Sequence, residues 1–337
     1  MAQKTTMADV AREAGVSLMT VSRVINNKDE ISEDTRQRVQ KVITRLGYRP
    51  SGIARSLAGR QTYTIGLIVP DIANPYFSGI AQGVATITNA ENFSVLLCDC
   101  DEDPDLEITM LDVLDEKRVD GVIVAAPRTS SKVLLPALAY YSNIVIINRL
   151  FEESDHTHVG AFVLSDNELG GYLITQCLIS HRHSRIGFLG GPKTSYGLAR
   201  RMEGYKKALA EAGLEFDPEI IRNCAPTVEG GKTNVSELLS SHPDITALFC
   251  FNDLVAIGAI QQCHQLGLRI PDDLAIFGYD DIPMATWITP SLSTCQVNFE
   301  QIGREAAKLL INRISNCDEE CENIIMQPKL IIRDSAP

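Results

Sequence analysis

The chain has 337 residues, of which 45% are apolar, and a formal net charge of −12. It is longer than one ordinary domain and can bury more than one core. It shows no apolar run of membrane-spanning length and no apolar segment typical of an export signal, so we expect a cytoplasmic protein without membrane partners. The nine cysteines are odd in number, and the two close pairs, Cys98-x-Cys100 and Cys317-x-x-x-Cys321, lack nearby histidine partners, which predicts reduced thiols and no metal site.

The positive charge is concentrated near the N-terminus. Residues 1–60 hold three Lys and eight Arg against three Asp and three Glu, a charge of +5, which leaves −17 for the remainder. A small basic segment on an acidic body is expected when one module contacts nucleic-acid phosphates and the other does not.

Residues 6–27, TMADVAREAGVSLMTVSRVINN, predict two short helices joined by a tight turn. Thr6 fits a helix N-cap, Gly15 fits the turn, and Ser17 can cap the second helix. A plain helical hairpin is the alternative, but the basic charge favours a helix-turn-helix, whose second helix lies in the DNA major groove. The predicted DNA contacts here are Thr6, Ser17, Leu18, Met19, Thr20, Ser22, Arg23 and Asn26.

The stretch DVAREAGVS followed by TVSRVIN resembles the start of the lactose/galactose-repressor (LacI/GalR) family of bacterial transcriptional regulators, and the resemblance covers nearly the full chain. It implies an N-terminal all-α helix-turn-helix headpiece and an α/β, two-lobed, periplasmic-binding-protein-like core. It also implies a homodimer on double-stranded operator DNA. A small-molecule effector, a sugar or sugar derivative, would bind between the lobes.

We expect the headpiece at residues 1–50, with a third helix between Ser32 and Gly47, and a hinge at 51–61. The hinge is too short to form a stable helix alone. The resemblance implies that it becomes helical on operator DNA, with Ala54 and Leu57 as contacts and Leu57 inserted in the minor groove. A plain linker is the alternative.

From Tyr63 onward, short apolar runs alternate with amphipathic segments, the pattern of parallel sheets covered on both faces by helices. The number of runs predicts two α/β halves. Within the core, 62–337, we expect a first lobe at about 62–160 and 293–322, and a second lobe at about 161–292 and 323–337. The apolar runs are TIGLIVP, SVLLCD, GVIVAA, NIVIIN, AFVLSD, RIGFLGG, EIIRN, TALFCF and LAIFGYD.

Ligands of open parallel sheets bind beyond the carboxyl ends of the strands. The loops there carry carboxylates, amides, arginines and aromatic rings, a set that suits a polyhydroxylated ligand. The family resemblance, applied position by position, narrows the set. The predicted effector contacts are Tyr76, Phe77, Asn148, Arg149, Ser195, Arg201, Asn252, Asp280 and Phe299.

Two positions depart from the family pattern and bear on which sugar would bind. Asn148 stands where many sugar-sensing members have Asp, and Pro226 stands where members often have an aromatic residue. Asp253 and Asp281 are interpreted as structural caps of the segments that follow them.

The sequence therefore predicts a sequence-specific transcriptional regulator, a repressor of a carbohydrate-utilisation operon. A global catabolite or purine-type regulator that answers to a corepressor or a phosphoprotein partner remains open. A solute-binding receptor would leave residues 1–60 unexplained. No G-x-G-x-x-G, P-loop or Ser-His-Asp grouping occurs, so we expect no enzyme activity, no catalytic residue and no cofactor.

Overall fold

The computed structural model describes residues 5–25, 31–48, 61–151, 160–315 and 323–336. The chain divides into two compact units, Met1–Thr62 and Tyr63–Pro337. Three predicted DNA contacts, Asn26, Ala54 and Leu57, lie outside the described residues, as does the predicted hinge up to residue 60. Within the described part, no helix is both long and apolar enough to cross a membrane.

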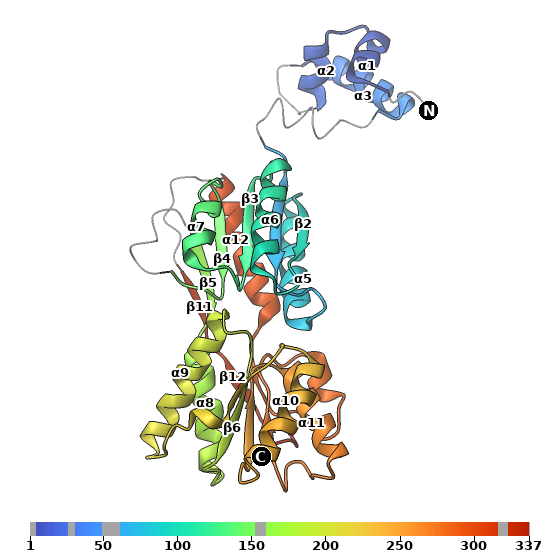
Figure 1. Ribbon diagram of the computed structural model, residues 1–337. Helices are drawn as coiled ribbons and strands as arrows, with labels where there is room; N and C mark the ends of the chain where they lie inside the picture. The colour runs from blue at the N-terminus through green and yellow to red at the C-terminus, as the bar shows by residue number, and fades with distance from the viewer. Residues whose placement is uncertain (1–4, 26–30, 49–60, 152–159, 316–322, 337) are drawn as a thin grey trace. The chain divides into compact units, whose positions relative to one another are not determined.

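The N-terminal unit is a three-helix domain, as the sequence predicted (Figure 1). Thr6 and Asp9 form the reciprocal capping box that starts the first helix, and Gly15 ends it with a left-handed φ of 65°. Val10, Val21 and Val39, one from each helix, are fully buried against one another in the domain core. The helices are α1 (Met7–Ala14), α2 (Leu18–Ile25) and α3 (Glu33–Leu46).

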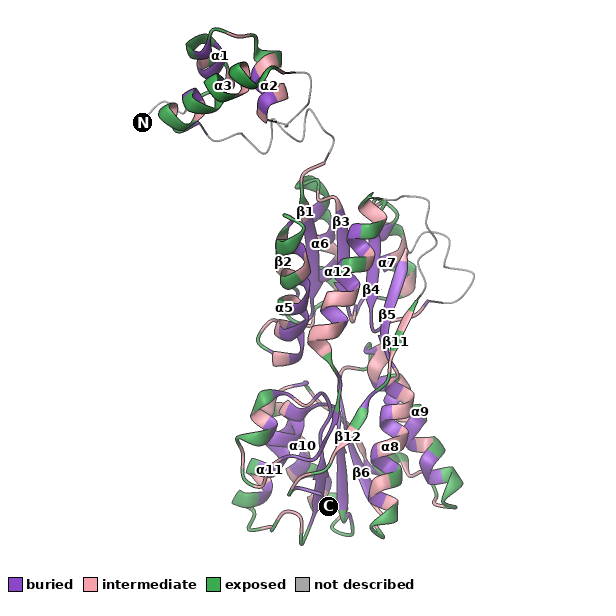
Figure 2. Cartoon of the chain, turned by 180° about the vertical axis from the view of Figure 1, so that it is seen from behind, coloured by how far each residue is buried: buried purple, intermediate pink, exposed green. Residues whose placement is uncertain are grey.

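The first lobe of the larger unit is built on a six-stranded sheet with the order β11-β5-β4-β3-β1-β2, whose pairs are all parallel. Its central strands are apolar throughout because helices cover both faces: α5 and α12 pack on one face and α6 and α7 on the other (Figure 2). The strands are β1 (Thr64–Val69), β2 (Ser94–Asp99), β3 (Gly121–Ala125), β4 (Ile144–Ile147), β5 (Ala161–Ser165) and β11 (Ile324–Met326). The helices are α5 (Pro75–Ala90), α6 (Pro104–Glu116), α7 (Ser131–Leu138) and α12 (Phe299–Ser315).

The second lobe repeats this plan with a four-stranded parallel sheet, order β7-β6-β8-β9. Helices α8 and α9 cover one face, and α10 and α11 cover the other. The strands are β6 (Ile186–Gly190), β7 (Ile221–Asn223), β8 (Ala247–Cys250) and β9 (Ala275–Phe277), with an antiparallel pair of β10 (Thr294–Gln296) and β12 (Lys329–Ile331). The helices are α8 (Asn167–Ser180), α9 (Tyr196–Glu211), α10 (Val228–Ser241) and α11 (Asp253–Gln265), with 3-10 turns η2 (Pro218–Ile220) and η3 (Pro283–Thr286).

The predicted lobe boundaries were wrong at three strands. Strand β5 pairs with β4, and β11 pairs with β5, so both belong to the first lobe, whereas β10 pairs with β12 of the second. A fully apolar run predicts a buried strand, but it does not say which of two sheets the strand will join. The described chain therefore crosses between the lobes three times: after β5, between β10 and α12, and between β11 and β12.

Helices α8 and α9 cross at two glycines. A Cβ on Gly171 would lie 2.2 Å from the carbonyl oxygen of Arg201, and one on Gly204 would lie 2.0 Å from that of Glu168. Only glycine permits this approach of the two backbones. The crossing brings Asn167, at the start of α8, beside the Arg201 side chain of α9.

Candidate functional site

Helix α2 exposes the side chains that the sequence assigned to DNA. Leu18 and Met19 are 53% and 66% exposed, while Val21 and Val24 on the opposite face are buried. The hydroxyl of Ser17 accepts the amide of Thr20 at 3.1 Å and so begins the helix. Of the other predicted contacts, Thr6 is an N-cap, and Thr20, Ser22 and Arg23 are half-buried. Exposed apolar side chains at the N-terminal end of such a helix can contact thymine methyl groups in the major groove.

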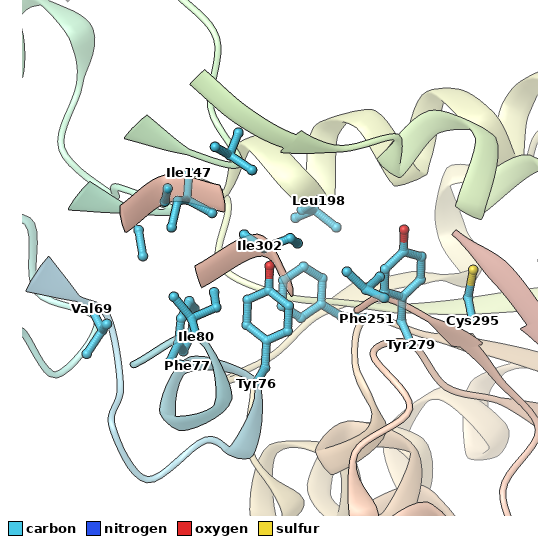
Figure 3. Close-up of a cluster of buried hydrophobic side chains, with 14 of the residues drawn as sticks. Val69, Tyr76, Phe77, Ile80, Ile147, Leu198, Phe251, Tyr279, Cys295 and Ile302 are labelled. Carbon is cyan, nitrogen blue, oxygen red and sulfur yellow. The ribbon is translucent and has the colours of Figure 1, made fainter. Parts of the chain in front are cut away.

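A cavity of about 40 Å³ lies between the two lobes of the larger unit. That volume holds roughly three water molecules. The first lobe contributes Asn74, Tyr76, Phe77, Glu102, Ala126, Arg128 and Asn148 to its walls. The second contributes Asn167, Ser195, Gly197, Arg201, Pro226, Phe251, Asn252 and Asp280. Figure 3 shows buried side chains from both lobes at this junction, among them Tyr76, Phe251 and Tyr279.

Arg201 is held in the second-lobe wall by contacts on several sides. Its Nε donates to Asn167 Oδ1 at 2.9 Å, and its Nη1 donates to the carbonyl of Phe251. The guanidinium carbon lies 3.5 Å from the ring centre of Tyr279 and 4.7 Å from that of Phe251. These hydrogen bonds and cation–π contacts stabilise a charge that is only 7% exposed.

Asp280 faces Arg201 across the same wall, with Oδ1 3.8 Å from Nη2 of the arginine. Burial raises the pKa of Asp280 to about 7, although Arg201 acts to lower it. The residue has a left-handed φ of 112°. A carboxyl group that titrates near neutral pH inside a cavity is a strong candidate for a ligand contact.

In the first-lobe wall, Asn148 makes hydrogen bonds to the end of β5, where the chain crosses to the second lobe, and to helix α5. This residue, at φ 53°, accepts the amide of Ser165 at 2.7 Å and donates to the hydroxyl of Tyr76. Burial, and then the charge of Asp280, raise the pKa of Tyr76. The ends of β4, β5 and the start of α5 are thereby joined at one point of the cavity.

Seven of the nine predicted effector contacts line the cavity; Arg149 and Phe299 do not. The guanidinium of Arg149 donates to the carbonyls of Pro127 and Thr129 and, at 3.0 Å, to Ser131 Oγ. These groups occupy the Arg149 guanidinium outside the lining of the cavity, and its effector contact stays a prediction. Phe299 lies behind the wall, with its ring centre 5.9 Å from that of Tyr76.

Two of the lining residues also begin helices. Asn252 accepts the amide of Val255 at 2.9 Å and donates to the carbonyl of Pro226 at 3.1 Å, and Ser195 accepts the amide of Leu198 at 3.2 Å. The two predicted structural aspartates have internal partners: Asp253 accepts the amide of Ile282 at 2.8 Å, and Asp281 pairs with Arg333 at 2.6 Å. Within the described ranges, no cluster of His, Cys, Asp and Glu could hold a metal ion.

The predicted effector contacts left out five polar or aromatic lining residues, Asn74, Glu102, Arg128, Asn167 and Phe251. Glu102 follows β2 and Arg128 follows β3, so the strand-end rule applied to every strand would have found both. Asn167 directly follows the loop at residues 165–166, and Phe251 directly precedes the predicted contact Asn252.

A helix-turn-helix unit and a two-lobed core with a polar cavity define a class of protein, the ligand-responsive DNA-binding regulators. Residues 6–51 match the model of the bacterial regulatory proteins of the lacI family, and residues 62–334 match that of the periplasmic binding proteins and sugar binding domain of the LacI family. The chain belongs to the LacI family of bacterial transcriptional regulators.

Curated relatives agree with this assignment over nearly the full length. The ribose operon repressor of Haemophilus influenzae is 36% identical over 98% of both chains. The transcriptional repressor PurR of Aliivibrio salmonicida is 33% identical over the same share. Among solved structures, the complex of the regulator CelR with cellobiose is 30% identical, with a TM-score of 0.74, over 99% of this chain and 100% of that one. The operator-bound lac repressor dimer, 24% identical over 99% of each chain with a TM-score of 0.87, shows the shared fold.

Proposed function

We propose that this regulator represses genes for carbohydrate use, and that a small polyhydroxylated effector bound between the lobes changes its affinity for operator DNA. The observation that carries the proposal is the pair Arg201 and Asp280 in the cavity wall, both less than 10% exposed. Burying two charges is costly, so such a pair is a candidate for a functional site. A carboxylate and a guanidinium can bind neighbouring hydroxyl groups of a sugar, and the rings of Phe77 and Phe251 can cover its apolar face.

The relatives support a sugar but leave a second class open. The ribose operon repressor is named for a sugar operon, and a LacI-family regulator from Enterococcus faecium, 29% identical, has a structure with bound ribose. PurR repressors are equally similar, at 33–36% identity. A purine corepressor, or a phosphoprotein partner, is therefore the alternative.

The cavity dimensions support a switch driven by movement of the lobes. The space between the walls is about 40 Å³, less than a sugar ring needs, so we expect the lobes to move when an effector enters. Since β1 starts two residues after the N-terminal unit ends at Thr62, movement of the first lobe is passed directly to the segment before it. In a homodimer, such movement would alter how two headpieces meet their half-sites.

DNA recognition is assigned to α2. Basic side chains of the headpiece would bind phosphates, Leu18 and Met19 would contact thymine methyl groups, and Arg23 would hydrogen-bond to a base, preferably guanine. Removing residues 1–60 should abolish operator binding and leave the core folded. Operator binding by the truncated core would overturn the assignment.

A thermal-shift screen tests the effector class, because a ligand that binds only the folded protein raises the unfolding temperature by mass action. The screen compares pentoses, hexoses, sugar phosphates and purines on the wild type and on Arg201→Ala. We expect a sugar to stabilise the wild type and not the variant, and to change operator binding in a gel-shift assay. Stabilisation by purines alone would overturn the carbohydrate proposal in favour of the purine class.

A further inference from the structure

Glu102 and Arg128 form an ion pair in the first-lobe wall. Nη2 of Arg128 donates to Glu102 Oε1 at 2.9 Å, Nε donates to the other carboxylate oxygen, and Nη1 donates to the carbonyl of Ala126 at 2.8 Å. The arginine side chain is 4% exposed and the glutamate side chain 21%. A guanidinium has five N–H groups. These bonds use three of them, so the pair can still donate to a ligand.

The backbone that carries Arg128 is fixed from two sides. Buried Glu107 accepts the amides of Arg128 and Thr129 at 2.8 and 3.4 Å. From the other side, Arg149 donates to the carbonyls of Pro127 and Thr129. These hydrogen bonds fix the position of Arg128 in the wall, so it cannot easily swing out to meet an incoming anion.

The charged side chains that line the cavity balance one another. They are Glu102, Arg128, Arg201 and Asp280, whose charges sum to zero above about pH 7, where Asp280 is ionised. Three of these charges act on the same point of the cavity, because Arg128, Arg201 and Asp280 each shift the pKa of the Tyr76 hydroxyl. A sugar hydroxyl can donate to a carboxylate and accept from a guanidinium without disturbing this balance. A phosphate or carboxylate would enter as an uncompensated buried charge next to two acids, which is strongly unfavourable.

We propose that the Glu102–Arg128 pair is a specificity determinant that makes the cavity select an uncharged polyol over its phosphorylated or carboxylated analogues. The inference rests on the proposed function, because it requires that the effector bind in this cavity. Glu102 neutralises Arg128 and so removes the positive charge that an anionic effector would need.

The test is titration calorimetry on the full-length wild type with matched probes: ribose and ribose 5-phosphate, and glucose and glucose 6-phosphate. Whichever of the two sugars binds, we expect its uncharged form to bind at least ~30-fold tighter than its phosphate. In Glu102→Gln, which leaves Arg128 uncompensated, this preference should fall by ~10-fold or more through tighter binding of the phosphate. Asp101→Asn, which removes an exposed carboxylate one residue earlier, should keep the wild-type preference.

Two outcomes would overturn the inference. A phosphate that binds as tightly as its parent sugar, and loses binding in Arg201→Ala, contradicts the charge selection and leaves the effector site in place. An unchanged preference in a folded Glu102→Gln contradicts the role of this pair. If no probe binds, or if Arg201→Ala binds like the wild type, the proposed function fails and the inference with it.

Discussion

Apolar side chains are usually buried and charged ones exposed, and helix α2 and the cavity between the lobes depart from this rule in opposite directions. Helix α2 presents Leu18 and Met19 to solvent, while the cavity buries Arg201 and Asp280. Exposed apolar side chains cost the folded domain little, whereas buried charges must be compensated by precise partners. Changes on the exposed face of α2 should therefore alter recognition alone, and changes in the cavity should alter both recognition and stability.

Arg201→Ala should give the largest effect. Removing one partner of a buried charge pair typically costs ~3–5 kcal/mol of folding stability. Effector affinity should also fall, by more than ~100-fold or about 2.7 kcal/mol, because the effector loses the charged donor of Arg201. Calorimetry measures the affinity, and denaturant unfolding of the same variant should show a stability loss. The matched control is Arg200→Ala, because Arg200 is the adjacent residue but pairs with Glu168 at a half-exposed position. Equal effects of the two substitutions would remove the distinction between cavity and surface.

The pH dependence should be the next largest effect, with Asp280 as its source. Because the folded-state pKa of about 7 exceeds the ordinary value, the folded protein binds more protons than the unfolded chain between about pH 4 and 7. This group's contribution to the unfolding free energy should thus fall as pH rises through that window and level off above it. Effector affinity should rise by up to ~10-fold from pH 6 to 8, because the ionised carboxylate is the better acceptor.

Asp280→Asn is the control for that profile. Asp280 interacts with Arg201 and Tyr76 in the cavity and with Asp253 behind it. Burial raises the pKa of Asp253, and the negative charge of Asp280 raises it further. The amide variant should lose the rise in affinity between pH 6 and 8. An unchanged profile would assign the titration to another group.

Substitution of Leu18 and Met19 by Ala should give the smallest loss of binding but a change of preference. We expect stability within ~0.5 kcal/mol of the wild type, because both side chains are exposed. Binding should weaken by several-fold on operators with thymines at the contacted positions and less on others. Val21→Ala, on the buried face of α2, should instead lower headpiece stability by ~2 kcal/mol. Equal weakening on every operator would place Leu18 and Met19 in packing.

The local parts of this architecture were predictable because each had a local signal. Thr6, Gly15 and Ser17 mark the ends of α1 and α2, and alternating apolar runs mark the buried strands. Strand β11 was assigned to the wrong lobe, because its pairing with β5 joins segments that lie far apart in the sequence. Sequence order carries no signal for that choice.

The site was predictable where a residue's direction follows from its place at a strand or helix end. Asp280, which follows β9, is such a residue, whereas Arg201 lies inside α9 and was assigned from the family resemblance. Arg149 is not, because its direction is decided by the carbonyls of Pro127 and Thr129, which another loop supplies. The same loop brings Arg128 to the cavity. The sequence did not predict either placement, because both depend on the tertiary arrangement of the loop after β3.

The central claim is that the cavity and the DNA-binding helix are coupled through one chain. Thermodynamic reciprocity requires that operator DNA change effector affinity by the same factor as the effector changes operator affinity. The direct measurement is effector titration of the full-length protein with and without saturating operator, beside operator titration with and without saturating effector. The account predicts equal factors, in the same direction, well above one. Identical effector affinity in the presence and absence of operator would contradict it.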